Sequence, residues 1–84
     1  MNHYTSPDFW GLFHALPQEV QDLARANYEL LKTDPYHPSL HLKKVGDYWS
    51  VRVGRRYRAL ATEVEDGLLW AWIGSHAEYD RIIS

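Results

Sequence analysis

The first third of the chain has the hydrophobic periodicity of helices. Ser6 and Pro7 come directly before a short apolar stripe, where Ser6 suits an N-cap and Pro7 the first helical position. Residues 17–33 then place their apolar side chains, among them Leu23, on one broad face, and the pair Asp34-Pro35 ends that pattern. The pattern therefore predicts two helices before residue 35.

From residue 40 onward the period changes from that of a helix to that of a strand. Alternating or continuous apolar runs at residues 40–45, 48–53, 56–65 and 68–74 predict four strands, and Asp66-Gly67 is a hairpin signal. The opening "MNHYTSPDFW" shows no evident strand, and residues 76–83 read as a short helix. We expect an α+β domain in which two N-terminal helices pack on a four-stranded, mostly antiparallel sheet and a short helix closes the chain.

Composition narrows the class of protein. A chain of 84 residues predicts a single domain over residues 1–84, and the absence of cysteine excludes disulfides and thiolate metal sites. No segment approaches the roughly 20 apolar residues of a membrane span, and the N-terminus lacks the basic start and apolar core of a signal peptide. A cytoplasmic protein without a membrane partner is the expectation.

Charge is distributed unevenly along the chain. The net charge is −2, yet residues 43–58 contain six of the nine basic residues and are opposed only by Asp47, which gives this strip a local balance of +5. A basic strip can attract phosphate even when the total charge is negative, although a solvated hairpin would have the same composition.

Two arginines within this strip could form an anion site. If residues 54–56 make a tight turn, Arg52 and Arg58 lie at mirror positions on neighbouring strands. Two facing guanidinium groups repel each other unless an anion lies between them, and a phosphate would satisfy both. The alternative is an ion pair between one arginine and a nearby acid: Glu63, Glu65 or Asp47.

The closing segment contains a second candidate. Ser75 and Glu78 have the spacing of a capping box, which explains both without a function. It leaves His76 unexplained: the positive end of the helix disfavours a protonated imidazole there, so His76 could act as a base or could be structural. Tyr79 could stack on a base, donate to phosphate or lie at the edge of the core. No histidine or carboxylate spacing predicts a metal, and no cofactor motif is present.

Three stretches of the sequence resemble a known family. They are the loop from Pro35 to Leu40 that leads into "LKKV", the segment "YWSVRVGRRYRAL" and the closing "WIGSHAEYDR". Over residues 17–83 the chain resembles the RelE/ParE superfamily of toxins from bacterial type II toxin–antitoxin systems. Small proteins of that superfamily pack two helices against a curved antiparallel sheet, so the resemblance implies the fold that the periodicity predicts.

The resemblance also implies an activity. RNA-cutting members of the superfamily enter the ribosomal A site and cleave messenger RNA without a metal, by attack of a 2′-hydroxyl on the adjacent phosphate. Arg58 matches the arginine of the family's Tyr-Arg pattern, which would bind the scissile phosphate, and Arg52 matches a basic residue on the second strand. His76 falls where relatives have a basic or histidine side chain soon after the last strand, and Tyr79 is a looser match to a tyrosine that can orient the nucleotide. The basic residues expected to hold the RNA backbone are Lys43, Lys44, Arg55 and Arg56.

Two other functions remain open at this stage. The ParE branch shares the fold but inhibits DNA gyrase, so that the basic strip would make protein contacts. A non-toxic interaction domain is the third possibility. In either toxin hypothesis the partner is a cognate antitoxin whose acidic or amphipathic segment covers the basic and apolar surface. No cofactor is expected.

Overall fold

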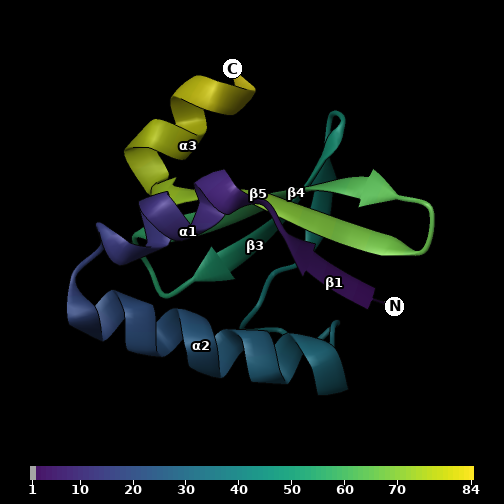
Figure 1. The fold of residues 1–84 in the computed structure, drawn as a ribbon, viewed down its shortest axis with the longest axis horizontal. Coiled ribbons are helices and arrows are strands. Elements are labelled where there is room, and N and C mark those ends of the chain that lie inside the picture. Colours follow the sequence, from purple (N-terminus) through teal and green to yellow (C-terminus); the bar gives the residue numbers. More distant parts are fainter. Residues whose placement is uncertain (1) are drawn as a thin grey trace.

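Residues 2–84 fold into a five-stranded sheet with three helices, in the α+β arrangement that the sequence predicts (Figure 1). The structure, a computed structural model, describes residues 2–84. The elements in chain order are β1 (Asn2–Thr5), α1 (Pro7–His14), α2 (Gln18–Thr33), β2 (Lys43–Val45), β3 (Tyr48–Val53), β4 (Tyr57–Val64), β5 (Gly67–Ser75) and α3 (His76–Ile83).

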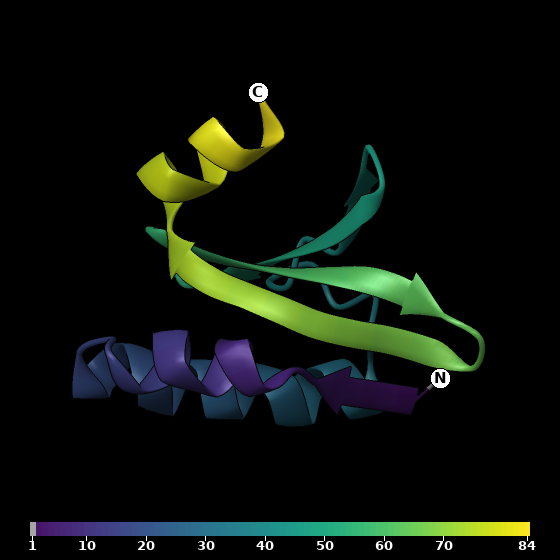
Figure 2. The same cartoon turned by 45° about the horizontal axis from the view of Figure 1, so that its top comes forward.

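The sheet has the strand order β1-β5-β4-β3-β2. All neighbouring strands are antiparallel except β1 and β5, which run parallel. Helices α1 and α2 lie on one side of the sheet and α3 on the other (Figure 2). The expectation of four strands is therefore wrong by one, because the N-terminal segment adds β1 at the edge.

Strand β1 has no local hydrophobic signature, which is why the sequence pattern missed it. Three of its four residues are exposed. It is held instead by distant partners: the Tyr4 hydroxyl donates to the Asp66 carboxylate at 2.7 Å, and the Trp70 indole N–H donates to His3 Nδ1 at 3.1 Å. These are tertiary contacts, and no window of the sequence around residues 2–5 contains them.

The helix ends agree with the sequence signals. The Ser6 hydroxyl caps α1 by accepting from the Phe9 amide, and α2 ends at Thr33, directly before Asp34-Pro35. The core between these helices and the sheet is a single cluster, made by Phe9, Phe13, Val20, Leu31, Leu40, Val51, Val53, Ala59, Ala61, Leu68, Trp70 and Ile73. Leu23, which the pattern placed on the buried face of α2, is 40 % exposed.

The strand predicted at residues 40–45 is shorter in the structure, where β2 begins at Lys43. His41 has a φ of 50°, which interrupts the extended backbone before β2. Leu40 is fully buried, and its carbonyl accepts the Arg52 amide at 2.7 Å. β2 pairs with β3 only as far as Ser50. Beyond that point the loop before β2 takes over, and its Leu40 carbonyl bonds the free edge of β3 at Arg52.

Gly67 has a different role from the one expected of it. The turn between β4 and β5 consists of residues 65 and 66, and Gly67 is already the first residue of β5, opposite Asn2 of β1. A Cβ on Gly67 would collide with the Asn2 backbone carbonyl. The glycine thus permits the close approach of β1 and is not needed for the turn.

Replacing Gly67 with alanine should destabilise the protein by about 1–3 kcal/mol, the usual cost of forcing extra volume into a packed position. Gly11→Ala is the matched control, since a Cβ at Gly11 meets nothing within 4 Å. It should stabilise α1 by about 0.5–1 kcal/mol through helix propensity. Chemical denaturation monitored by tryptophan fluorescence measures both. If both variants change the free energy of unfolding by the same amount and in the same direction, this role of Gly67 is contradicted.

Candidate functional site

Arg52 and Arg58 face each other across β3 and β4. The register pairs them directly, with Val53 opposite Tyr57 at the turn, so both side chains project from the same face of the sheet. The turn at residues 54–56 produces this register, and Gly54 takes a φ of 65°, a left-handed conformation that favours glycine. The mirror placement predicted from the sequence is confirmed.

Neither arginine has an acidic partner within residues 2–84: the ion pairs there join Lys32 to Glu29, Lys44 to Glu63 and His76 to Asp80. The Nε of Arg52 is buried without a hydrogen-bond partner among these residues, and one Arg58 N–H donates to the Tyr57 carbonyl at 2.9 Å. Burial, followed by the Arg52 charge, lowers the pKa of Arg58. A buried donor beside a second cation is unfavourable until an anion arrives.

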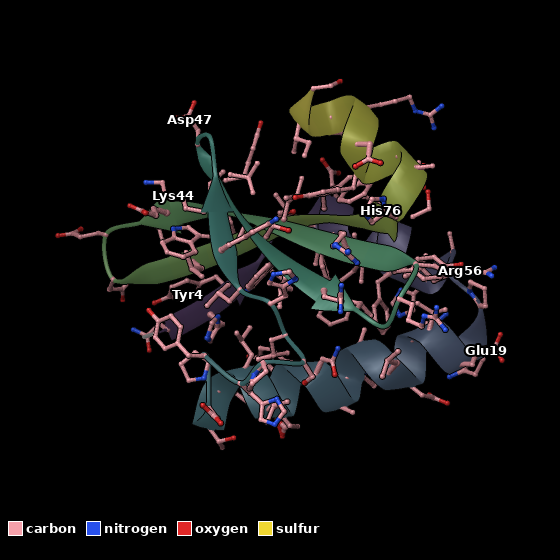
Figure 3. All side chains as sticks on the ribbon, turned by 180° about the vertical axis from the view of Figure 1, so that it is seen from behind. Tyr4, Glu19, Lys44, Asp47, Arg56 and His76 are labelled. Carbon is pink, nitrogen blue, oxygen red and sulfur yellow. The ribbon has the colours of Figure 1, made fainter. Side chains whose placement is uncertain are left out.

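Helix α3 begins beside this pair with the predicted capping box. The Ser75 hydroxyl accepts from the Glu78 amide, and the Glu78 carboxylate accepts from the Ser75 amide. The hydrogen bonds from the Ser75 amide and hydroxyl lower the pKa of Glu78. The His76 amide donates to the Arg56 carbonyl at 2.7 Å, which ties the first turn of α3 to the β3–β4 turn; Figure 3 shows both residues at the same end of the sheet.

A row of contacts connects His76 to the arginine pair. The His76 ring centroid lies 5.7 Å from that of Tyr79, and the Arg58 guanidinium carbon lies 5.9 Å from the Tyr79 centroid. His76 Nδ1 is 3.1 Å from a carboxylate oxygen of Asp80. The structure thus brings together Arg52, Arg58, His76 and Tyr79, and it adds Asp80. Sequence reasoning missed Asp80, although its spacing of four residues from His76 on a helix was a usable signal.

Tyr79 is buried, with 4 % of its surface exposed. A ring so covered has no free face on which an RNA base could stack, so of the three roles open for Tyr79 the position at the core edge fits best. Its ring lies at a cation–π distance from the Arg58 guanidinium. The buried Tyr79 ring therefore packs against the Arg58 guanidinium.

The four other basic residues divide between the two faces of the sheet and the turn. Lys43 pairs with Ser50 and shares the face of Arg52, whereas Arg55 and Arg56 are exposed in the β3–β4 turn. Lys44 pairs with Trp49 and projects from the opposite face. Figure 3 shows Lys44 far from His76 along the sheet.

Glu63 holds Lys44 on that opposite face. Its carboxylate accepts from the Trp49 indole at 2.7 Å and from the Lys44 ammonium at 3.1 Å. The Trp49 bond and then the Lys44 bond lower the pKa of Glu63. Glu63 thus forms its ion pair with Lys44. The alternative ion pair between Glu63 and an arginine is absent from the described residues.

A hollow of about 810 Å³ lies on the other side of the sheet, between α1, α2 and the strands. Its wall includes the charged residues Arg25, Glu29 and Lys32. Its lining also contains several aromatic residues, which are Tyr4, Phe9, Trp10, Phe13, Tyr28 and Trp70. None of Arg58, His76 and Asp80 lines it. The hollow is therefore a surface feature separate from the arginine pair.

Within residues 2–84, no three histidine, aspartate or glutamate side chains gather where they could hold a metal ion. The helices of this same part of the chain are too short or too polar to cross a bilayer.

Comparison with known proteins identifies a family and a fold. Residues 18–81 match the family model described as the ParE-like toxin domain. The chain resembles a chain of the RelB–RelE antitoxin–toxin complex from Methanococcus jannaschii, with a TM-score of 0.73 at 14 % identity, covering 96 % of this chain and 99 % of that one. Curated protein sequences give no match.

Two further structures agree with this fold. A chain of the E. coli DinJ–YafQ toxin–antitoxin complex gives a TM-score of 0.72 at 13 % identity, over 92 % of this chain and 93 % of that one. The YoeB/ParE toxin from Agrobacterium tumefaciens gives 0.68 at 13 % identity, over 90 % and 99 %. At such identities the likeness extends to the fold, and the function has to be argued from the residues.

Proposed function

This chain belongs to the family of ParE-like toxin domains, and we propose that within this family it is an endoribonuclease that cuts messenger RNA at the ribosome. The observation that carries the proposal is the direct pairing of Arg52 with Arg58 without an acid between them. A pair of facing cations with a buried, unpartnered N–H is suited to a bound anion, and the phosphate of RNA is the anion that both guanidinium groups fit.

In the proposed reaction the scissile phosphate binds between Arg52 and Arg58. The 2′-hydroxyl of the preceding nucleotide attacks the phosphorus, and His76 takes its proton. The bond from phosphorus to the 5′-oxygen breaks, and the departing oxygen takes a proton from water. Negative charge grows on the phosphoryl oxygens in the transition state, where two fixed guanidinium groups stabilise it. Tyr79 keeps the Arg58 guanidinium in place through its ring. The chemistry needs no metal.

The backbone of the RNA is proposed to run over the face and turn that carry Arg52. Lys43 shares that face, and Arg55 and Arg56 extend the positive charge around the β3–β4 turn. Lys44 is the least suited of the four basic residues, because it lies on the other face and is neutralised by Glu63. Phosphate contacts of this kind position an RNA without selecting its sequence.

Induced expression with and without the neighbouring gene, followed by sequencing of RNA ends, tests the function. We expect new 5′ ends spaced by codons within translated messages, and we expect the antitoxin from the neighbouring gene to suppress them. If messenger RNA stays intact when the chain is expressed without the antitoxin, the endoribonuclease proposal is rejected.

Gyrase inhibition is the second candidate, and the match to a ParE-like model favours it. In that function the cations of the β3–β4 turn would contact a protein surface. DNA damage signalling and loss of supercoiling, together with intact messenger RNA, would select it. Growth without any defect would instead favour a non-toxic interaction domain.

The proposed partner in either toxin function is a cognate antitoxin acting in the cytoplasm. The solved relatives include an antitoxin–toxin complex from Methanococcus jannaschii and the E. coli DinJ–YafQ complex. Here the aromatic hollow beside α1 and α2, whose wall contains Arg25 as well as the paired Lys32 and Glu29, suits an amphipathic segment with an acidic residue opposite Arg25. The basic turn at Arg55 and Arg56 suits acidic residues of the same partner.

A further inference from the structure

The contact between His76 and Asp80 adds a residue to the site. His76 Nδ1 lies 3.1 Å from an Asp80 carboxylate oxygen, and the two residues are one helical turn apart on α3. We propose that Asp80 is a positioning residue that holds His76 in the tautomer with the proton on Nδ1, which leaves Nε2 free to accept a proton from the substrate. The part of this inference that concerns RNA rests on the function proposed above.

The helix that carries both residues is fixed at its start. The capping box of Ser75 and Glu78 satisfies the first amides of α3, and the His76 amide bonds to the Arg56 carbonyl. Tyr79 is buried against Arg58 on the inner side of α3. With the backbone held at these points, residues 76 and 80 keep the spacing that places side chains of a helix next to each other.

The chemistry of the two groups decides where the proton lies. An ionised carboxylate can only accept hydrogen bonds, and a neutral imidazole has one N–H and one lone-pair nitrogen. Nδ1 lies 3.1 Å from the Asp80 carboxylate, so a lone pair on Nδ1 would face the negative oxygen, whereas a proton there is attracted to it. This contact favours the proton on Nδ1, and the lone pair is then on Nε2. Within residues 2–84, Nε2 of His76 makes no hydrogen bond.

This arrangement suits a base in the proposed cleavage. The proton of the 2′-hydroxyl moves to Nε2 while the P–O2′ bond forms and the P–O5′ bond breaks, and the departing 5′-oxygen takes a proton from water. The imidazolium that results lies beside the Asp80 carboxylate, and the opposite charges stabilise each other. The site regains its starting state when Nε2 returns its proton to water.

The test measures the tautomer directly, by long-range ¹H–¹⁵N correlation NMR of the labelled full chain at neutral pH. The His76 signals are those that vanish in His76→Gln. In the wild type we expect an unprotonated Nε2. Asp80→Ala should move the population toward Nε2–H, whereas Asp80→Asn keeps an acceptor oxygen and should retain Nδ1–H. Glu65→Ala, which removes the same charge at the opposite end of β5, should leave the spectrum unchanged.

The same variants have an expected effect on cleavage. Asp80→Ala should lower kcat about tenfold with KM unchanged, a fraction of the roughly 10²–10⁴ that a general base contributes. Asp80→Asn should restore part of the loss. A wild type with the proton on Nε2, or a tautomer that Asp80→Ala leaves unchanged, would overturn the role of Asp80. If the NMR result holds and wild-type protein cuts no RNA, Asp80 still sets the tautomer and the endoribonuclease function alone is rejected.

Discussion

Arg58→Ala is expected to lower kcat/KM for cleavage of ribosome-bound messenger RNA by about 10²–10³-fold, the usual loss when one preorganised donor to a developing negative charge is removed. Arg58 faces Arg52 directly and is supported by the Tyr79 ring. Its loss removes half of the proposed phosphate site and also removes a repulsion between two cations. We therefore expect the fold to be retained, with a free energy of unfolding equal to or above that of the wild type.

Two variants sharpen this measurement. Arg81→Ala removes the same charge from an exposed position on α3 and should leave cleavage unchanged. Arg58→Lys keeps the charge but loses the planar fork that binds a phosphate through two N–H groups, so it should recover only part of the rate. A purified Arg58→Ala protein that cuts as fast as the wild type would remove Arg58 from the mechanism.

The largest effect on stability is expected from Phe13→Ala, at about 3–5 kcal/mol of destabilisation. Phe13 is 2 % exposed and packs against the rings of Phe9 and Trp10, while the Arg25 guanidinium of α2 lies 4.9 Å from its centroid. The side chain thus joins α1 to α2 as well as to the core. A folded chain of 84 residues has about 4–13 kcal/mol of stability in total, so this one change removes a large share of it.

Thermal and chemical denaturation of matched variants checks this prediction. Leu12→Ala alters the neighbouring residue of α1, which is 38 % exposed, and should cost no more than about 0.5 kcal/mol. Phe13→Leu keeps most of the buried volume and should fall between the two. If Phe13→Ala costs no more than Leu12→Ala, α1 contributes little to the stability of the domain.

The sequence alone determined the features that depend on neighbouring residues. Ser6 and Pro7 start α1, Asp34-Pro35 ends α2, and the capping box starts α3, because caps and prolines act within one turn of the chain. The facing of Arg52 and Arg58 is also a feature that depends on residues close together in the sequence. The turn at residues 54–56 is so short that the positions of Arg52 and Arg58 in the sequence almost fix their positions in space.

Only the tertiary structure decided which partners distant side chains would find. β1 lacks an apolar pattern and is held by Asp66 and Trp70, more than sixty residues away along the chain. Lys44 lies with Glu63 on the face opposite Arg52, and Tyr79 is buried beneath Arg58. Such pairings depend on which strands and helices come to lie together. Periodicity gives the face of an element, and the packing of the whole chain determines what that face meets.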